Sequence, residues 1–153
     1  MTSPIELGDP RLPARFWAKV NPCPMTGCWL WNAALNGDGY GGFRLSRPRR
    51  MTSSHRISYE TLAGTVSVGL QLDHLCRVRS CCNPAHLQPV TVRENLLRGI
   101  GFAAVHAART HCPSGHPYEG ENLYILRGRR HCRICSSASA TAATARRRVL
   151  GRR

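Results

Sequence analysis

Six residues in one short stretch, between Leu72 and Gly99, have the types and spacing needed for metal chemistry. They are Asp73, His74, Cys76, Cys81, His86 and Asn95. An ordinary hydrophobic core has no need for thiols, imidazoles and hard oxygen ligands so close together. Thiolates with an imidazole are zinc ligands, whereas carboxylate and amide oxygens suit Mg²⁺. The stretch therefore predicts a structural zinc site combined with a second site for a hard divalent cation.

Tetrahedral zinc needs four ligands, and the even spacing of this stretch supplies three. These three are Cys76, Cys81 and His86. We expect Cys28 to be the fourth, because it opens a short apolar strand that would lie beside the motif, and Cys23 is the alternative. Cys82 adjoins Cys81, so its side chain should point elsewhere and act as a small buried hydrophobe. The competing interpretation is a set of unrelated structural cysteines with His86 as a core histidine.

The remaining residues fit hydrolysis of a phosphodiester, which requires an activated water and a cation near the departing oxygen. His74 would be the general base, since a free imidazole titrates near pH ~6.5. Asp73 and Asn95 would hold Mg²⁺ or Mn²⁺ through oxygen atoms. Adjacent strand residues point to opposite faces, so Asp73 and His74 can share one centre only if the strand end bends.

These residues must be positioned by a strand, a metal-bound loop, a second strand and a helix. The expected strands are Leu70 to His74 and His86 to Val90. Thr91 is a good N-cap for a helix ending at Gly99, with Glu94 at the capping-box position. The upstream segments predict a helix over Leu12 to Val20, strands over Cys28 to Trp31 and Tyr40 to Leu45, and a helix from Ser53 or Ser54 to about Leu62. Residues 12–99 thus form an expected α+β domain after a flexible lead-in over residues 1–11.

A second cysteine cluster follows an expected linker over residues 100–111. Cys112, His116, Cys132 and Cys135 have the spacing of a Cys₃His zinc site within residues 112–135, a small ribbon-like module. His111 and His131 are alternative ligands, and a redox or free-thiol cluster is the competing interpretation. Residues 136–153 form a basic tail that we expect to become fully helical on DNA.

Net charge points to a polyanionic partner. The chain of 153 residues has 22 Lys and Arg against 8 Asp and Glu, a net charge of +14. A chain this basic favours nucleic acid, and we expect double-stranded DNA. No apolar run approaches the ~20 residues of a membrane span, and no secretion signal is visible, so we expect a cytoplasmic protein without membrane contact. Eight cysteines in such a protein favour metal over disulfides.

Arginines supply the expected contacts with DNA. The candidates are Arg44, Arg47, Arg49, Arg50, Arg77, Arg79, Arg129 and Arg130. Guanidinium groups grip phosphate and give affinity with little sequence information. The segment from Tyr40 to Arg50 is the candidate for base reading in the major groove.

The stretch from Leu72 to Gly99 resembles the phage-type HNH, or His-Me finger, endonucleases, and is similar to the zinc-stapled homing endonucleases. The pattern His-x-Cys-x4-Cys-x4-His, followed nine residues later by Asn, fits at each step, and Asn83-Pro84 matches the turn that shapes the loop. The segments GCWLW, GYGGF and HRISYE extend the resemblance to roughly residues 15–135. The resemblance implies a ββα-metal core, DNA cleavage with one strand cut per active site, and a phage-encoded protein acting in a bacterial host. It also implies that Arg56 contacts the scissile phosphate.

Two other functions compete with this one. A zinc-dependent DNA-binding protein without catalysis would use the same zinc loop, and an RNA-binding zinc protein would have the same charge. The sequence leaves open the target, nicking against double-strand cleavage, and a monomer against a homodimer. Intron homing, genome packaging and attack on host DNA are all compatible with it.

Overall fold

The computed structural model describes residues 5–150 and divides into two compact units, one ending at Arg98 and the other beginning at Gly99. Each unit is described by itself. The first four residues of the expected lead-in and the last three of the expected tail lie outside the described part. No helix within residues 5–150 combines the length and the apolar character that crossing a membrane would require.

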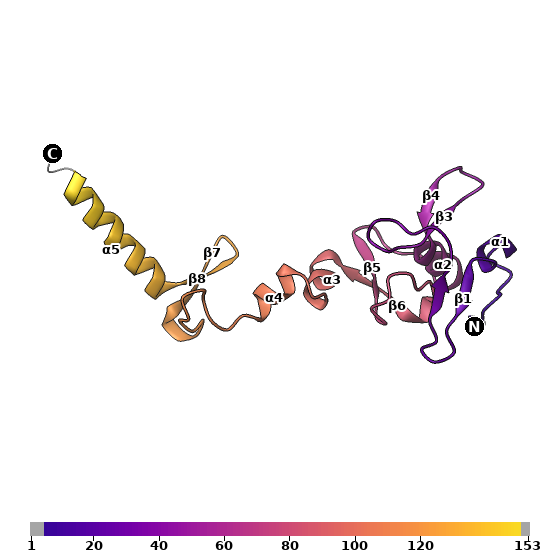
Figure 1. Cartoon of the computed structure of the whole chain (residues 1–153), viewed down its shortest axis with the longest axis horizontal. Helices are drawn as coiled ribbons and strands as arrows, with labels where there is room; N and C mark the ends of the chain where they lie inside the picture. The colour runs from indigo at the N-terminus through magenta and orange to yellow at the C-terminus, as the bar shows by residue number, and fades with distance from the viewer. Residues whose placement is uncertain (1–4, 151–153) are drawn as a thin grey trace. The chain divides into compact units, whose positions relative to one another are not determined.

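The first unit is a mixed α+β structure built from three two-stranded antiparallel sheets (Figure 1). Its elements are α1 (Ala14–Trp17), β1 (Val20–Pro22), β2 (Trp29–Trp31), β3 (Gly42–Arg44), β4 (Met51–Ser53), α2 (Ser54–Leu62), β5 (Leu70–His74), the 3₁₀ helix η1 (Pro84–His86), β6 (Leu87–Thr91) and α3 (Val92–Arg98). The sheets pair β1 with β2, β3 with β4, and β5 with β6. The expected order of strand, loop, strand and helix is confirmed over residues 70–98.

One expectation for the N-terminal half was wrong, and two of its strands, β1 and β4, were not predicted. The predicted helix from Leu12 to Val20 is only the four-residue α1, because Val20 already pairs with Trp31 in the β1–β2 sheet. Strand β4 was not predicted. With three residues and no apolar alternation, it gives no pattern by which a strand is recognised.

An aromatic core joins the elements of the first unit. Phe16 is fully buried and lies 5.1 Å from the Trp31 ring and 5.3 Å from the Phe43 ring, measured between centroids. Such tilted and edge-to-face contacts are the favoured geometry for aromatic pairs. Cys82 joins the same core, and its backbone N–H donates to the Trp29 carbonyl at 2.8 Å. The core therefore fixes the loop between β5 and β6 against β2.

Gly41 allows the chain before β3 to lie against the start of α2. A Cβ atom at this position would meet the Trp31 ring at 2.5 Å, so no side chain fits. The Gly41 carbonyl accepts from the Ser54 N–H at 2.8 Å. This close approach places Tyr40 beside His55, with 5.2 Å between ring centroids.

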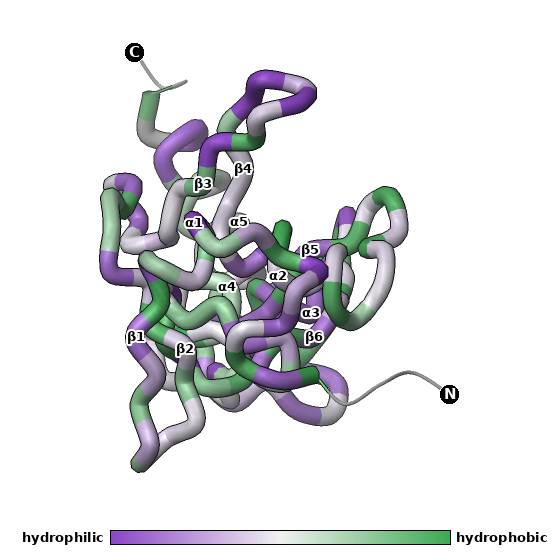
Figure 2. Tube along the Cα trace, turned by 90° about the vertical axis from the view of Figure 1, so that its right-hand side faces the viewer, coloured by the Kyte–Doolittle hydropathy of each residue, from purple (hydrophilic) through white to green (hydrophobic). Residues whose placement is uncertain are grey.

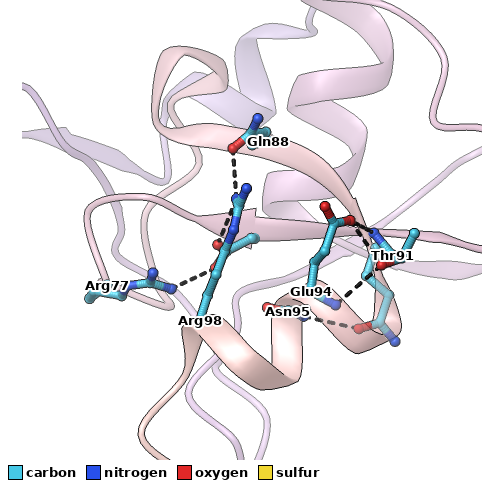
Figure 3. A network of polar contacts seen from close by, with 8 residues as sticks. Arg77, Gln88, Thr91, Glu94, Asn95 and Arg98 are labelled. Carbon is cyan, nitrogen blue, oxygen red and sulfur yellow. Dashed lines mark hydrogen bonds and ion pairs between the residues drawn. The ribbon is translucent and has the colours of Figure 1, made fainter. Parts of the chain in front are cut away.

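The capping box of α3 is confirmed (Figure 3). The Thr91 N–H donates to the Glu94 carboxylate at 2.9 Å, and the Glu94 N–H donates to the Thr91 hydroxyl at 3.1 Å. These bonds satisfy two backbone donors that a helix start leaves without partners. They fix where α3 begins and therefore which of its side chains face β5.

The second unit is a small ribbon between two helices. It contains α4 (Phe102–Ala108), the 3₁₀ helix η2 (Gly120–Asn122), β7 (Leu123–Leu126), β8 (Arg129–Cys132) and α5 (Arg133–Leu150). Helix α4 falls inside the expected linker, and its several alanines favour a helix there. Residues 136–150 of the expected tail belong to the helix α5. Among the described residues of this unit, the only buried apolar side chains are those of Cys112 and Cys132, so no hydrophobic core holds it.

Candidate active site and metal centres

Four predicted zinc ligands of the first unit converge on one point. The ligand atoms of Cys28, Cys76, Cys81 and His86 all lie within 4.8 Å of one another. The His86 Nδ1 atom is 3.5 Å from the Cys28 Sγ atom and 3.6 Å from the Cys81 Sγ atom. Tetrahedral zinc with bonds of ~2.0–2.3 Å separates its ligands by about 3.3–3.8 Å. The cluster fits zinc, and the fourth member is Cys28, whereas Cys23 lies outside it.

Backbone contacts with β2 bring the loop to Cys28. Leu30 and Cys81 form an antiparallel bridge, and the Trp31 N–H donates to the Ser80 carbonyl at 2.9 Å. Asn83 donates through Nδ2 to the Gly27 carbonyl at 2.7 Å, and its Oδ1 accepts from the Ala85 N–H at 3.0 Å. Asn83 therefore shapes the turn that presents η1, which ends at His86. Cys82 points the other way, into the core, as predicted.

Burial raises the pKa of the thiols in this cluster. The pKa of Cys81 rises to about 12, and that of Cys76 also rises. Without a cation, both thiols therefore keep their protons near neutral pH. Zinc binds thiolates, so loading this cluster releases protons and weakens at acid pH.

The second cluster has the same composition and size. The ligand atoms of Cys112, His116, Cys132 and Cys135 lie within 4.8 Å of one another. The His116 Nδ1 atom is 3.5, 3.7 and 3.2 Å from the three Sγ atoms, in that order. The alternative ligands are engaged elsewhere: the His111 ring bonds the Thr110 hydroxyl, and the His131 ring stacks on Tyr124. All eight cysteines are free, so no disulfide competes with metal.

His74 has the setting of a general base. Its side chain is 5% exposed, and its Nε2 atom lies 3.0 Å from the Cys81 carbonyl oxygen. A carbonyl can only accept, so Nε2 carries the proton of the neutral ring and Nδ1 keeps a free lone pair. Burial lowers the pKa of His74, and its bond to the Cys81 carbonyl opposes part of that effect. The ring is therefore neutral and able to accept a proton at neutral pH.

Two residues that the sequence did not reveal lie beside the His74 ring. The His55 ring lies 4.8 Å from the His74 ring at an interplanar angle of 69°, and the Tyr40 ring lies 5.7 Å from it. Burial, together with the neighbouring charges of His74 and Arg56, lowers the pKa of His55 to about 4. His55 begins a helix and Tyr40 precedes a hairpin, so no spacing in the sequence relates either residue to His74.

Asn95, one predicted ligand of the catalytic cation, lies on α3 (Figure 3), and the other, Asp73, lies in β5 and contacts α3 through Arg98. The Asp73 carboxylate is buried and receives Arg77 Nη1 at 2.7 Å and Arg98 Nη1 at 3.5 Å. Asn95 Nδ2 donates to Gln71 Oε1 at 3.0 Å, which leaves its Oδ1 atom without a protein donor among the described residues. Asp73 and Asn95 thus sit on the same face of β5.

His74 leaves β5 on the other face. The ladder with β6 keeps its regular register through its last pair, His74 with Leu87, so successive side chains of β5 alternate between its faces to the end. Asp73 consequently points toward α3, while His74 points toward α2 and the zinc loop. The two side chains are neighbours at the end of β5 and flank it from opposite sides.

Two arginines near His74 are held differently: Arg56, predicted to contact the scissile phosphate, and Arg79, predicted to contact DNA. Arg56 Nε donates to Glu60 at 2.8 Å, one turn along α2. Arg79 donates through Nη1 to the Asp38 carbonyl at 2.9 Å, and its guanidinium lies 5.7 Å from the centre of the Tyr40 ring. Arg79 is therefore attached to the Tyr40 side of the His74 pocket.

A basic hollow lies at the β3–β4 hairpin, whose tip is strongly hydrophilic in Figure 2. It has a volume of about 490 Å³ and is lined by Arg15, Arg44, Leu45, Ser46, Arg47 and Arg49. Arg15 was not predicted; it donates to the Arg44 carbonyl at 2.8 Å and stacks over Phe43. No carboxylate lines the hollow, so its guanidinium charges are available to an external anion.

Arg129 and Arg130 line a separate hollow of about 400 Å³ within the second unit. Arg130 donates to the Arg109 carbonyl at 2.7 Å, and its guanidinium lies over the Tyr118 ring. Part of the Arg130 guanidinium is therefore engaged inside the protein. The Arg129 side chain makes no hydrogen bond among the described residues.

Comparisons with known proteins agree with this arrangement. The profile of the HNH endonuclease family matches residues 53–97, from the residue before α2 to α3. The gene 5.3 protein of Enterobacteria phage T3 is 31% identical over 78 residues, which are 48% of this chain and 77% of that protein. Protein 2.8 of Escherichia phage T7 is 34% identical over 70 residues, 46% of this chain. Protein 7.7 of the same phage is 32% identical over 71 residues, also 46% of this chain.

The chain spans about half the length of the two T7 proteins, 47% of Protein 2.8 and 53% of Protein 7.7. No solved structure matches this chain. The profile match, the relatedness to phage proteins and the two Cys/His clusters able to hold zinc agree with one another. This chain belongs to the HNH endonuclease family.

Proposed function

We propose that this protein is a metal-dependent DNA endonuclease in which His74 is the general base. The observation that carries the proposal is the anchored imidazole. Nε2 is committed to the Cys81 carbonyl, so the proton-accepting Nδ1 atom is the one left for substrate. If His74 were buried only to fill space, nothing would require this particular tautomer.

In the proposed reaction His74 takes a proton from water as the water oxygen bonds to phosphorus. The bond from phosphorus to the 3′ oxygen breaks, and the electron pair leaves with that oxygen. The imidazolium that forms stays hydrogen-bonded to the Cys81 carbonyl, an acceptor that favours the charged ring. The neutral resting state of His74 makes the base available at neutral pH.

Asp73 and Asn95 are the residues that would hold the catalytic Mg²⁺ or Mn²⁺. A phosphate at the end of β5 would meet this cation on one side and His74 on the other, which suits attack of water opposite the leaving oxygen. They suit a hard cation because Asp73 is a buried carboxylate and the Oδ1 atom of Asn95 is free to bind. When bound, the cation supplies positive charge to the leaving 3′ oxygen. Arg77 and Arg98 neutralise Asp73 in its absence.

Zinc in the first cluster would position the base as well as the loop. Cys81 provides its Sγ atom to the ligand set and its carbonyl oxygen to His74. Fixing the thiolate fixes the carbonyl of the same residue. A structural zinc here therefore orients the catalytic imidazole through a single residue.

DNA would be held by guanidinium groups on both units. In the first unit these are Arg44, Arg47, Arg49 and Arg50 of the hairpin, joined by Arg15, together with Arg56, Arg77 and Arg79 near β5 and α2. Arg129 and Arg130 would contribute from the second unit. The four guanidinium groups around the hairpin hollow, with no carboxylate among them, support phosphate contacts there. We propose one active site per chain and hence one strand cut per binding event.

One observation favours a second candidate, a zinc-dependent DNA-binding protein without catalysis. Both carboxylate oxygens of Asp73 are bound by guanidinium groups, as in a purely structural ion-pair network. If the protein is a nuclease, Asp73→Asn should lose metal-dependent cleavage and still bind DNA. The alternative predicts no product with any divalent metal.

Conversion of supercoiled plasmid to nicked circles separates the two candidates. The zinc-loaded protein is assayed with Mg²⁺, with Mn²⁺ and with EDTA, alongside Asp73→Asn and the matched variant Asp38→Asn. Asp38 is exposed, and only its backbone carbonyl contacts Arg79, so Asp38→Asn should cleave like the wild type. Equal cleavage by Asp73→Asn would remove Asp73 from the proposed cation site.

A further inference from the structure

His55 is a buried titratable group to which the proposed reaction gives no role. Its ring packs against the proposed base His74 on one side and against Tyr40 on another. Its Nδ1 atom is buried and has no hydrogen-bond partner among the described residues. Burying a polar atom without a partner is unfavourable, so this ring is held by its aromatic contacts and not by a hydrogen bond of Nδ1.

The hydrogen bond of His74 does not by itself prevent tilting of the ring. A single hydrogen bond, from Nε2 to the Cys81 carbonyl, holds one corner of the ring. Tilting of the ring would displace Nδ1 and weaken this bond, so that the Nδ1-protonated tautomer could also form. The His55 ring at 4.8 Å and 69°, and the Tyr40 ring at 5.7 Å, stand where they limit such tilting.

We propose that His55 is a positioning residue that, together with Tyr40, fixes the plane of the His74 imidazole so that Nδ1 keeps facing the attacking water. The proposal rests on the proposed function, since it assumes that His74 is the base. An edge-to-face aromatic contact is directional, so a ring at position 55 selects one orientation of its neighbour. A neutral ring also avoids repelling the imidazolium that forms on His74.

The position of His55 is itself fixed from two directions. It lies in the first turn of α2, whose start is attached to the Gly41 carbonyl through the Ser54 N–H. Tyr40 adjoins Gly41 and is covered by the Arg79 guanidinium, which is bonded to the Asp38 carbonyl. The restraint on His74 therefore comes from α2 and from the loop before β3, both outside the β5–β6 hairpin.

The test compares His55→Ala, which removes the ring, with His55→Phe, which keeps an aromatic ring without nitrogen atoms. His106→Ala is the control, because His106 is an exposed histidine of the second unit. Plasmid nicking gives kcat and KM, filter binding gives the DNA Kd, and metal analysis gives the zinc content. Nitrogen-15 spectra of the imidazoles report the tautomer of His74 without any turnover.

We expect His55→Ala to lower kcat by about 10–100-fold, the usual cost of removing a group that orients a reactive one. KM, Kd and zinc content should stay near wild type, and His55→Phe should recover kcat to within about threefold of wild type. The spectra should show His74 as a single tautomer, protonated on Nε2, in the wild type and in His55→Phe. In His55→Ala we expect a mixture.

Three results would overturn the proposal. They are a wild-type kcat in His55→Ala, a His55→Phe variant as impaired as His55→Ala, or a single Nε2-protonated tautomer of His74 in His55→Ala. The spectra need no cleavage. A wild-type protein that makes no product would therefore refute the proposed function, while the tautomer measurement would still decide whether His55 orients His74.

Discussion

Acidification should destabilise the first unit through His55. The pKa of this imidazole is about 4 in the folded protein, because the ring is buried and lies near His74 and Arg56, against an ordinary value of 6.5. A histidine whose pKa falls on folding favours the native state while it is neutral. Its contribution to stability is complete above pH 6.5 and is lost as the pH falls toward 4.

The size of this loss follows from the two pKa values. Each unit of difference corresponds to ~1.4 kcal/mol, so the full change between pH 6.5 and 4 is at most ~3 kcal/mol. That amount is a large part of the 5–15 kcal/mol by which domains are typically stable.

Urea unfolding between pH 4 and 7 measures this effect, with free zinc held in excess so that metal loading does not change. Wild type should lose stability more steeply than His55→Phe, and the gap between the two curves should change by up to ~3 kcal/mol over the range. His106→Ala should follow the wild type. Parallel curves for wild type and His55→Phe would show that His55 does not titrate as its burial predicts.

Three other perturbations have definite outcomes. Cys28→Ser should lower the zinc content from two ions per chain to one, whereas Cys23→Ser should leave two, because only Cys28 lies in the cluster. Metal analysis after dialysis measures the zinc content of both variants. Glu94→Ala should reduce the unfolding free energy by ~1 kcal/mol through loss of the capping box with Thr91, measured by urea denaturation. Arg15→Ala should weaken DNA binding and reduce the slope of log Kd against log salt by about 1, if the hairpin hollow binds one phosphate through this residue.

The zinc clusters and the β5–β6–α3 unit could be predicted because their determinants are local. Ligand spacing of a few residues selects a loop that can close around one ion, and Thr91 with Glu94 specifies a helix start. The choice of Cys28 over Cys23 also followed from the strand it precedes. In each case the informative residues are neighbours in sequence or belong to one short element.

The surroundings of His74 could not be predicted because they depend on tertiary packing. His55 and Tyr40 both reach His74 only because Gly41 lets the loop before β3 lie against α2. Arg15 reaches the hairpin hollow because α1 ends early and packs Phe16 against Phe43. The direction of the Asp73 side chain could not be predicted either, because it depends on whether β5 stays regular to its last residue.

The most direct test of the central claim is plasmid nicking by His74→Ala. If His74 is the base, the zinc-loaded wild type nicks DNA with Mg²⁺ and stops with EDTA, while His74→Ala is slower by ~10²–10⁴-fold. The variant should bind DNA and hold two zinc ions as the wild type does, since its imidazole belongs to neither cluster. Nicking by His74→Ala at the wild-type rate would contradict the account.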